Sequence, residues 1–524
     1  MFFDQLTIGA VLRATAKAKS DHVAIKQGDL QLTYRELDES VDKLAAYLLE
    51  TGLKKGDRVA YIFLNQWEIL ASYYAIARIG AVVVSLNYRL MPEEIEFQLK
   101  KTTARALLYD ASFGPVLSQL PNSLIKGLHL ISSGDGVDGP LPESTFTTIM
   151  EMPSRGEVTT IVQASDDSGI WFTSGTTGKS KGAIVRHTSS LASAEVTSLS
   201  CKIGADCRFL ATAPLFHRGA MEDMHLAVTL VGGTHIMLPK FDARKALELI
   251  ESERVTHAFI VPTMSRLMLQ DPECARFDLR SMQRWISASA PFPPELAMAL
   301  RERLCLREDV VMDAYGITES LLNTVCEPKE MASHPGSVGR PVSKMRIRIV
   351  DEDLQWLPQG RVGEIVTSGP TTFRSYLDDD EAFKAAVFEA EGVPWYRTGD
   401  LGYCDADGFF YIVDRKKDMV ISGGENVYCA EVENAIARHC KVAEVAVVGL
   451  PDEMWGERVV AVVVPRKDEI PTVEDIIGSC GNLAPYKRPR EVRFVASLPR
   501  NSFGKVQKPE LRKLGASVIK AGKP

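Results

Sequence analysis

The sequence lacks the features of a secreted or membrane-spanning protein. Its nine cysteines are scattered along 524 residues, without a Cys-x-x-Cys pair or the Cys/His spacing of a zinc site. Such cysteines are typical of reduced thiols, so we expect a cytoplasmic protein. Residues 1–5 contain no Lys or Arg, and no apolar run approaches the length of a membrane span. We therefore expect neither secretion nor integral membrane association.

The composition also excludes a disordered or fibrous chain. Hydrophobic residues make up 45% of the sequence and charged residues 25%, which is ordinary for a globular protein. A chain of 524 residues exceeds the length at which a single core keeps growing. We therefore expect two or more domains.

The charge is distributed unevenly. The formal net charge is −7, yet residues 481–524 hold eleven Lys or Arg against two acidic residues. A basic tail on an acidic body is usually a solvated face, and it can also mark a nucleic-acid or membrane patch. We interpret this tail as a cap that meets an anionic ligand, and we expect no nucleic-acid partner.

Apolar runs of strand length alternate with segments of helical period through the first 400 residues. Residues 58–63 and 81–85 look like strands, and residues 69–79 between them look like a helix. This alternation predicts α/β layering. A helix is also expected at residues 242–252, and further strands are expected at residues 106–109, 235–238 and 258–261.

The pattern changes towards the C-terminus. From residue 363 the strands are shorter, and residues 405–408 read as a hairpin turn. The charged run at residues 414–418 reads as a linker, so we predict an N-terminal domain of residues 1–416 and a C-terminal domain of residues 417–524. Beyond the linker the sequence predicts a compact α+β unit. Its helices are expected at 430–437 and from 473, and its strands at 443–448 and 459–464.

A glycine-rich and hydroxyl-rich loop with two lysines follows an apolar segment at residues 171–182. Glycines allow backbone N–H groups to approach anionic oxygens, hydroxyls donate further hydrogen bonds, and lysines supply charge. The spacing excludes a Walker A loop, because only two residues separate Gly175 from Gly178. A solvated turn is the alternative to phosphate binding. The candidate residues are Thr173, Ser174, Gly175, Thr176, Thr177, Gly178 and Lys179.

Four further motifs follow this loop. They are Tyr-Gly-Ile-Thr-Glu at 315–319, Tyr-Arg-Thr-Gly-Asp at 396–400, Asp-Arg-Lys-Lys-Asp at 414–418 and Ser-Phe-Gly-Lys at 502–505. In this order, the five motifs resemble those of the adenylate-forming superfamily of acyl- and aryl-CoA synthetases, luciferases and peptide-synthetase adenylation domains. The resemblance implies a large N-terminal α/β body with several subdomains and a smaller, mobile α+β C-terminal domain.

Joining a carboxylate to the α-phosphate of ATP requires several negative charges to be neutralised. The resemblance implies that the loop at 173–179 holds the β- and γ-phosphates. It implies that Glu319 binds Mg²⁺ as a hard oxygen ligand and that Thr318 approaches the phosphate. Lys505 is expected to pair with the carboxylate and the α-phosphate as they meet. Taken alone, Glu319 would more often be a solvated carboxylate.

The nucleoside would lie against two further segments. The resemblance implies that Tyr315 stacks on adenine, with Gly316 allowing a tight turn, within a motif that begins at Asp313. Ser289, Ala290 and Pro291 stand where the family has a Gly-Ala-Pro turn along the adenine. Tyr315 in isolation would be read as a core aromatic residue.

The ribose and coenzyme A are assigned by the same resemblance. Asp400 would accept hydrogen bonds from both ribose hydroxyls, because its carboxylate has two acceptor oxygens, and Arg415 would be a second ribose contact. Lys417 is the position that the family uses as a hinge, so that one domain presents two faces to one site in turn. Gly423 and Gly424 would leave room for the pantetheine arm, although a Gly-Gly pair is also simply a flexible turn.

His217 follows the apolar run Pro-Leu-Phe at residues 214–216. Relatives place an aromatic residue or His beside the carboxylate at this position, and a satisfied core histidine is the alternative. The neighbouring residues 221–225 are candidates for lining the acyl pocket or its rim.

The expected activity is that of an AMP-forming acyl-CoA synthetase using ATP, Mg²⁺ and coenzyme A. A carboxylic acid and ATP would give acyl-AMP and pyrophosphate, and CoA would then give acyl-CoA and AMP. A medium- or long-chain fatty acid is the first expectation, and an aryl or alicyclic acid is the second. Other readings are an acyl-AMP ligase that loads a carrier protein, a luciferase-like oxygenase and a silent nucleotide-binding relative. A homodimer is left open.

Overall fold

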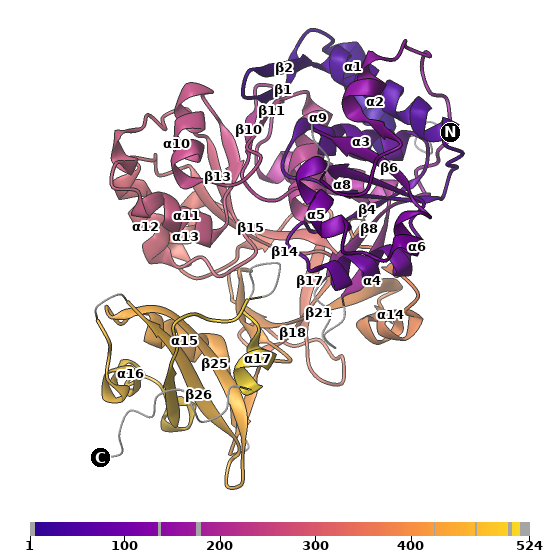
Figure 1. Cartoon of the computed structure of the whole chain (residues 1–524). Helices are drawn as coiled ribbons and strands as arrows, with labels where there is room; N and C mark the ends of the chain where they lie inside the picture. Colours follow the sequence, from indigo (N-terminus) through magenta and orange to yellow (C-terminus); the bar gives the residue numbers. More distant parts are fainter. Residues whose placement is uncertain are drawn as a thin grey trace. The chain divides into compact units, whose positions relative to one another are not determined.

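The computed structural model describes residues 6–134, 138–173, 180–423, 425–466, 469–500 and 506–513, and Figure 1 labels many of their helices and strands. The chain forms two compact units. The first comprises Met1–Ile347, Thr367–Tyr396 and Gly408–Phe410, and the second comprises Arg348–Val366, Arg397–Asp407 and Tyr411–Pro524. The expected boundary between residues 416 and 417 stays a prediction.

Within the described residues, the first unit contains a nine-stranded sheet. In sheet order its strands are β16 (Arg340–Pro341), β15 (Leu321–Cys326), β14 (Val311–Ile317), β13 (Arg284–Ser287), β12 (His257–Phe259), β10 (Arg208–Ala211), β11 (Thr234–Met237), β1 (Val23–Gln27) and β2 (Leu30–Thr33). Strands β1, β11, β10, β12, β13 and β14 run parallel. The outer strands β2, β15 and β16 pair antiparallel with their neighbours. The loops after the parallel strands therefore share one edge.

An eight-stranded sheet forms the second layer of the same unit within the described ranges. In sheet order its strands are β19 (Ser375–Tyr376), β9 (Lys181–Arg186), β8 (Asp167–Thr173), β4 (Val82–Ser85), β3 (Arg58–Ile62), β5 (Ala106–Asp110), β6 (His129–Ser133) and β7 (Ser144–Thr145). The run from β8 to β7 is parallel, and β9 and β19 are antiparallel. Strands β4 and β5 are buried along their whole length, as their continuous apolar runs predict.

Helices cover these sheets. They are α1 (Ile8–Ala18), α2 (Tyr34–Glu50), α3 (Trp67–Arg78), α4 (Pro92–Thr102), η2 (Ala111–Phe113), α5 (Gly114–Leu117), α6 (Asn122–Ile125), α7 (Phe146–Glu151), α8 (His187–Ser200), the π-helix η3 (Gly219–His225), α9 (Leu226–Val231), α10 (Ala243–Ser252), α11 (Pro262–Gln270), η4 (Cys274–Arg276), α12 (Pro294–Arg303), α13 (Pro328–Ser333) and α14 (Asp380–Ala386). Local sequence starts several of them. At α2 the Thr33 side chain accepts from the backbone N–H of Glu36, and the Glu36 side chain accepts from that of Thr33.

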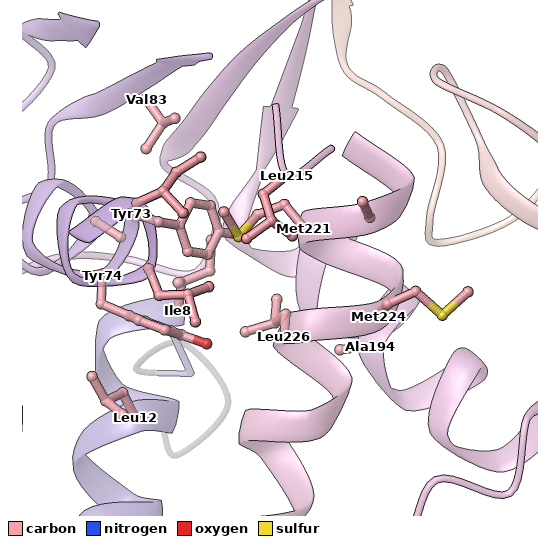
Figure 2. Close-up of a cluster of buried hydrophobic side chains, with 14 of the residues drawn as sticks. Ile8, Leu12, Tyr73, Tyr74, Val83, Ala194, Leu215, Met221, Met224 and Leu226 are labelled. Atoms are coloured by element: carbon pink, nitrogen blue, oxygen red, sulfur yellow. The ribbon is translucent and has the colours of Figure 1, made fainter. Parts of the chain in front are cut away.

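The hydrophobic core of the first unit joins helices from distant parts of the chain. Ile8 of α1, Tyr73 of α3 and Leu226 of α9 are buried in one cluster, which Figure 2 shows together with Val83 and Met221. A second cluster packs α10, α11 and α12 against β10–β14. Burial of these apolar side chains is the main force that holds the layers together.

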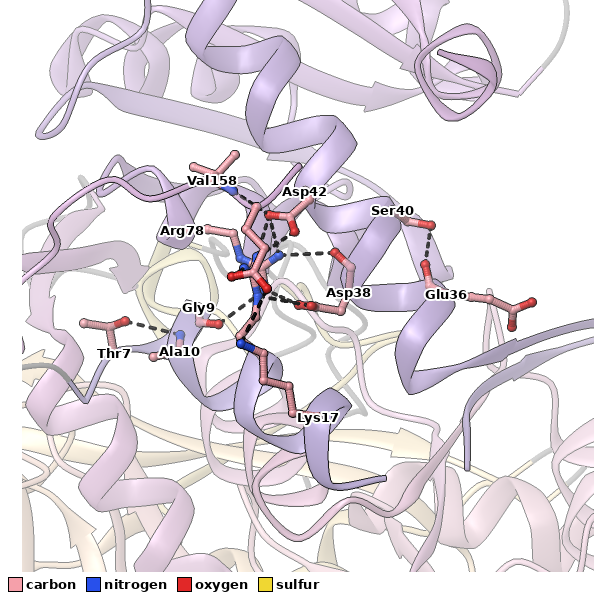
Figure 3. A network of polar contacts seen from close by, with 12 residues as sticks. Thr7, Gly9, Ala10, Lys17, Glu36, Asp38, Ser40, Asp42, Arg78 and Val158 are labelled. Carbon is pink, nitrogen blue, oxygen red and sulfur yellow. Dashed lines mark hydrogen bonds and ion pairs between the residues drawn. The ribbon is translucent and has the colours of Figure 1, made fainter. Parts of the chain in front are cut away.

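Three helices of the first unit are also joined by buried charge. Arg78 of α3 forms ion pairs with Asp38 and Asp42 of α2, the latter at 3.0 Å (Figure 3). Arg13 of α1 reaches the same Asp42 at 2.6 Å. The Arg78 side chain is 5% exposed. Each cation is paired, which offsets the cost of its burial.

The carboxyl edges of the two sheets are tied together by buried side chains. Asn65, which follows β3, donates to the carbonyls of Ala211 and Ala213, each at 3.0 Å, and accepts from the backbone N–H of Leu215. At the end of β4, the Ser85 hydroxyl donates to the carbonyl of Phe216 at 3.0 Å. The segment that leads to His217 is therefore held from the neighbouring sheet.

A third sheet contains the strands β17 (Arg346–Val350), β18 (Gly363–Ser368), β21 (Val393–Cys404) and β20 (Val387–Ala390) in that order, with β22 (Phe410–Arg415) beside β21. A fourth sheet lies in the second unit, in the order β24 (Glu425–Val427), β23 (Val420–Ser422), β26 (Gly456–Pro465) and β25 (Val442–Asp452), with β27 (Glu491–Phe494) beside β26. The second unit also contains the helices α15 (Cys429–Ala437), α16 (Val473–Ser479), η5 (Pro485–Lys487) and α17 (Lys508–Lys513). Val447 and Val459 point into one apolar cluster, and Val448 and Val460 point into another.

The positions of the expected elements are confirmed, but the strands beyond residue 363 are not all shorter, since β21 has 12 residues and β25 has 11. Helix α3, strands β3, β4, β5, β11 and β12 and helix α10 lie where the alternating pattern predicts them. Gly408, with φ of 84°, turns the chain between β21 and β22, and residues 416–418 form a turn. No helix within the described ranges is long and apolar enough to cross a bilayer.

Candidate active site

The glycine-rich loop connects two antiparallel strands of the eight-stranded sheet. Thr173, the last residue of β8, is paired with Lys181, the first residue of β9. The Lys181 ammonium lies 5.1 Å from the centre of the Tyr376 ring. Residues predicted for the phosphate loop that lie outside the described ranges are Ser174, Gly175, Thr176, Thr177, Gly178 and Lys179. The described ends of the loop, Thr173 and Lys181, thus lie at the carboxyl end of β8.

The proposed adenine wall follows β13. Ser289, Ala290 and Pro291 are all exposed at the carboxyl end of this strand. Ser289 has φ of 72°, in the left-handed region that favours glycine. The Ser in place of the family's Gly therefore keeps a glycine-like backbone at a cost in strain.

Asp313 lies on β14, opposite Ser287 of β13. Its side chain is buried, and its Oδ1 has no hydrogen-bond partner among the described residues. Burial raises the pKa of this carboxyl well above its usual value, although the backbone N–H of Ala314 opposes the rise. The Oδ1 atom is therefore available to pair with a ligand.

Strands β14 and β15 approach each other closely at Gly316. A bulge separates Tyr315 from Gly316, and Gly316 faces Leu322. A Cβ on Gly316 would lie 2.4 Å from the carbonyl oxygen of Leu321, so only glycine fits. Tyr315 itself is 7% exposed. The turn between these strands carries Thr318 and Glu319.

The Glu319 carboxylate is held by a pair of tyrosines. The Tyr376 hydroxyl donates to Glu319 Oε1 at 2.8 Å, and the Tyr376 and Tyr396 hydroxyls are 2.9 Å apart. Burial first, and the nearby Glu319 charge second, raise the pKa of both phenols, so each remains a hydrogen-bond donor at neutral pH. The carboxylate of Glu319 is thereby oriented, and its residue is 8% exposed.

Three successive carbonyls of this turn accept hydrogen bonds from protein groups. Arg218 Nη1 donates to the carbonyl of Thr318 at 2.7 Å, the backbone N–H of Phe373 donates to that of Glu319 at 2.6 Å, and the Thr371 hydroxyl donates to that of Ser320 at 2.5 Å. The backbone on both sides of Glu319 is therefore fixed.

His217 lies between the strand end of β10 and the π-helix η3. Its backbone N–H donates to Pro214, and its ring centre lies 4.3 Å from that of Phe216. Residues 221–225, considered for the acyl pocket, are buried with exposures of 0–6%. Asp223 accepts from Ser193 and from Thr197, and His225 contacts His235 at 2.8 Å. These side chains are thus enclosed by protein groups, and their role in lining the acyl pocket or its rim stays a prediction.

The second unit contains the residues assigned to the ribose. Arg415 Nε lies 2.6 Å from Asp400 Oδ1, and Asp400 is 3% exposed. The backbone N–H of Asp400 also donates to the Thr398 hydroxyl. The structure thus brings together two residues that are 15 positions apart in sequence.

The hinge and the pantetheine residues also belong to the second unit. Lys417 is exposed in the turn after β22. Gly423 has φ of 64° and donates from its backbone to Trp455 at 2.8 Å. Gly424 and Lys505 lie outside the described residues.

Sequence reasoning missed three residues that act on the Glu319 turn. Arg218 directly follows His217, and Tyr396 opens a motif that was interpreted only for its aspartate. Tyr376 has no motif around it. The available signal was that Arg218 and Tyr396 lie next to residues already assigned a role. Arg218 also follows an apolar run, where a charged side chain requires a buried partner.

The residues present fit a Mg²⁺ ion that is carried mainly by a polyphosphate. No group of three or more His, Cys, Asp or Glu among the described residues forms a protein-only metal cage. Glu319 is a single oriented carboxylate, and Mg²⁺ is commonly bound by one or two carboxylates together with substrate phosphates. A cation at this turn would thus depend on bound nucleotide.

Comparison with known proteins agrees with this geometry. Residues 12–377 match the profile of the AMP-binding enzyme family, and residues 431–505 match that of the AMP-binding enzyme C-terminal domain. A methyl-dioxo-octahydro-indenyl-propanoyl:CoA ligase of Mycobacterium tuberculosis is 36% identical, covering 98% of this chain and 100% of its own. An indoleacetate–CoA ligase of Aromatoleum aromaticum is 34% identical, covering 94% and 95%.

A solved structure shares the whole architecture. ATP-bound MatB from Rhodopseudomonas palustris has a TM-score of 0.87 and 30% identity, covering 97% of this chain and 98% of its own. The sequence motifs, the oriented Glu319 and the matched relatives agree. The chain therefore belongs to the AMP-binding family of adenylate-forming enzymes, in the branch of the acyl- and aryl-CoA ligases.

Proposed function

We propose that this protein is an ATP-dependent acid–CoA ligase that forms acyl-AMP and pyrophosphate, and then acyl-CoA and AMP. The observation that carries the proposal is the Glu319 carboxylate, fixed by Tyr376 at 2.8 Å where the carboxyl edges of two sheets meet. Ligands of open α/β sheets bind beyond the carboxyl ends of the strands. An oriented carboxylate at that edge suits a nucleotide with its cation.

The first half-reaction moves AMP onto the carboxylate of the acid. One substrate carboxylate oxygen attacks the α-phosphorus, and the bond from that phosphorus to the bridging oxygen of pyrophosphate breaks. Glu319 would hold Mg²⁺, which offsets the charge of the phosphates when it is bound. Lys505 and the loop at residues 173–179 would supply further positive charge and hydrogen-bond donors. His217 would lie beside the substrate carboxylate.

Each unit contains residues that the motifs assign to the nucleoside. The unpartnered Oδ1 of Asp313 would accept a hydrogen bond from the amino group of adenine, beside Tyr315, Gly316 and the exposed turn at Ser289. Asp400, paired with Arg415, has a second oxygen suited to the ribose hydroxyls.

In the second half-reaction the CoA sulfur attacks the acyl carbon, and AMP leaves with the electron pair of the broken C–O bond. We propose that the part of the chain after Lys417 turns about this residue between the two steps. The exposure of Lys417 and the left-handed backbone of Gly423 support this division of roles.

We propose an apolar carboxylic acid as the substrate. The two ligases reported above are named for ring-bearing acids, and a 33% identical ligase of Mycobacterium tuberculosis is named for long-chain fatty acids, so we propose that the acid is a fatty, aryl or alicyclic one. We also propose a cytoplasmic location, supported by nine cysteines that are all free thiols. Light scattering of the purified protein, which gives its molar mass in solution, would test whether it forms a homodimer.

Mass spectrometry of product mixtures tests this proposal. The protein, ATP and Mg²⁺ would be incubated with pooled aryl, alicyclic and fatty acids, with and without CoA. We expect an acyl-CoA with CoA and bound acyl-AMP without it, and Lys505→Ala should abolish both products. Acyl-AMP without any thioester would instead support loading of a carrier protein. If a broad panel of acids gave neither product, that result would contradict the ligase assignment.

A further inference from the structure

We propose that Arg218 and Glu222 form a buried positioning pair that fixes the turn of Glu319 for binding of the cation and nucleotide. This inference rests on the proposed role of Glu319. Arg218 does not itself contact the reacting atoms in this assignment. It acts through the backbone of Thr318 and through the segment that carries Tyr376.

The two charged side chains are paired inside the first unit. Arg218 Nε lies 2.7 Å from Glu222 Oε2, and both side chains have no exposed surface. They face each other across one turn at the start of the π-helix η3, and the Tyr73 hydroxyl is 3.4 Å from Glu222 Oε1. A buried arginine would be strongly unfavourable without this carboxylate. Glu222 therefore fixes where the guanidinium lies.

The guanidinium joins two separate segments at the site. Its Nη1 donates to the carbonyl of Thr318 at 2.7 Å, and its Nη2 lies 3.3 Å from the carbonyl of Thr371. Thr318 precedes Glu319 in the turn between β14 and β15. Thr371 lies five residues before Tyr376, whose hydroxyl holds the Glu319 carboxylate. One planar group thus sets the spacing between Glu319 and its hydrogen-bond donor.

Arginine is suited to this task and lysine is not. Its planar fork donates in fixed directions to three acceptors at once, whereas a lysine ammonium is a compact charge at the end of a flexible chain. Arg218→Lys should keep a charge opposite Glu222 but lose at least one of the two backbone hydrogen bonds. The turn would then sample more positions, and a cation ligand displaced by about 1 Å binds and acts less well.

A purely structural pair is the competing explanation, and the chain provides a matched control. Arg78 is also a buried arginine in the first unit, paired with Asp38 and Asp42 and donating to the carbonyl of Gly9 (Figure 3). It contacts helices α1 and α2 rather than the Glu319 turn. Arg78→Lys therefore reproduces the loss of buried hydrogen bonds without touching the site.

Mn²⁺ binding, followed by electron paramagnetic resonance with a non-hydrolysable ATP analogue, tests the inference apart from turnover. We expect Arg218→Lys to weaken Mn²⁺ binding at least tenfold, and Glu319→Gln to weaken it further. Arg78→Lys should lower the melting temperature and leave Mn²⁺ binding within twofold of wild type. Equal Mn²⁺ binding by Arg218→Lys and wild type would overturn the inference.

A second variant keeps the inference testable if Arg218→Lys does not fold. Glu222→Gln retains an acceptor for Arg218 Nε but removes the charge that fixes the guanidinium, so we expect a weaker loss of Mn²⁺ affinity, about threefold. An unchanged affinity in this variant would also contradict the proposal. If the wild-type protein bound no Mn²⁺ with nucleotide, the assignment of Glu319 would fail instead, so the two failures are distinguishable.

Discussion

Replacing Gly316 by alanine tests whether the close approach of β14 and β15 positions the active-site turn. The added Cβ would lie 2.4 Å from the carbonyl oxygen of Leu321, 2.9 Å from its carbonyl carbon and 3.3 Å from Cα of Leu322. All three atoms belong to the backbone, so no side chain can move aside. To reach an ordinary contact, the strands must separate locally by about 1 Å, and such overpacking costs about 1–3 kcal/mol.

The displacement would fall on the residues between the two strands. Thr318 and Glu319 lie in this turn, and their carbonyls are fixed by Arg218 and by the backbone N–H of Phe373. A misplacement of about 1 Å can reduce catalysis about 100-fold. We therefore expect Gly316→Ala to lower the rate of ATP–pyrophosphate exchange about 100-fold and to lower the melting temperature by a few degrees.

A matched glycine controls for the general effect of alanine. Gly204 is exposed, and a Cβ built on it has no heavy atom within 4 Å. Gly204→Ala should leave exchange unchanged and should not destabilise the protein, because alanine mainly reduces the entropy of the unfolded chain. If Gly316→Ala retained wild-type exchange and stability, the tight strand spacing would not position the Glu319 turn.

Two further predictions concern stability. Burial raises the pKa of Asp223 from 3.8 to about 7. Between these pH values the folded protein holds a proton on Asp223 that the unfolded chain has released. The free energy of unfolding therefore falls as the pH rises. From pH 5 to pH 7 this group should cost about 3 kcal/mol at about 1.4 kcal/mol per pH unit. Asp223→Asn should remove that slope from urea unfolding curves, and an unchanged slope would assign it to other groups. Ser289 has φ of 72°, a left-handed conformation that is less costly for glycine. Ser289→Gly should therefore raise the free energy of unfolding by up to about 1 kcal/mol without weakening ATP binding. A loss of stability would mean that the Ser289 side chain stabilises the turn.

Sequence alone predicted much of the fold because the signals are local. Continuous apolar runs at β4 and β5 indicate strands buried on both faces, and the helical period of α3 and α10 separates helices from strands. The five motifs were sufficient to place the chain in its family, since they combine residue types that polyphosphate chemistry requires in a fixed order.

The assignment of individual residues was less complete from sequence. Glu319, Asp313 and Asp400 were identified from motifs, but Tyr376 and Arg218 were not given roles. Residues 221–225 were considered for the acyl pocket because they follow His217. The structure shows them buried, with Glu222 directed to Arg218 and Asp223 to Ser193 and Thr197 by the π-helix η3, and their place in the acyl pocket stays a prediction.

The sequence by itself determined the α/β class and the charged groups suited to ATP, whereas the expected tight turn at Gly316 is in the structure a close approach of β14 to β15. Tertiary structure decided which of these groups act together. Tyr376 lies 57 residues from Glu319 and Arg218 lies 100 residues from Thr318, and no local pattern encodes such pairings. They arise because burial of the apolar faces of two sheets brings their carboxyl edges together, and polar groups enclosed there must find partners.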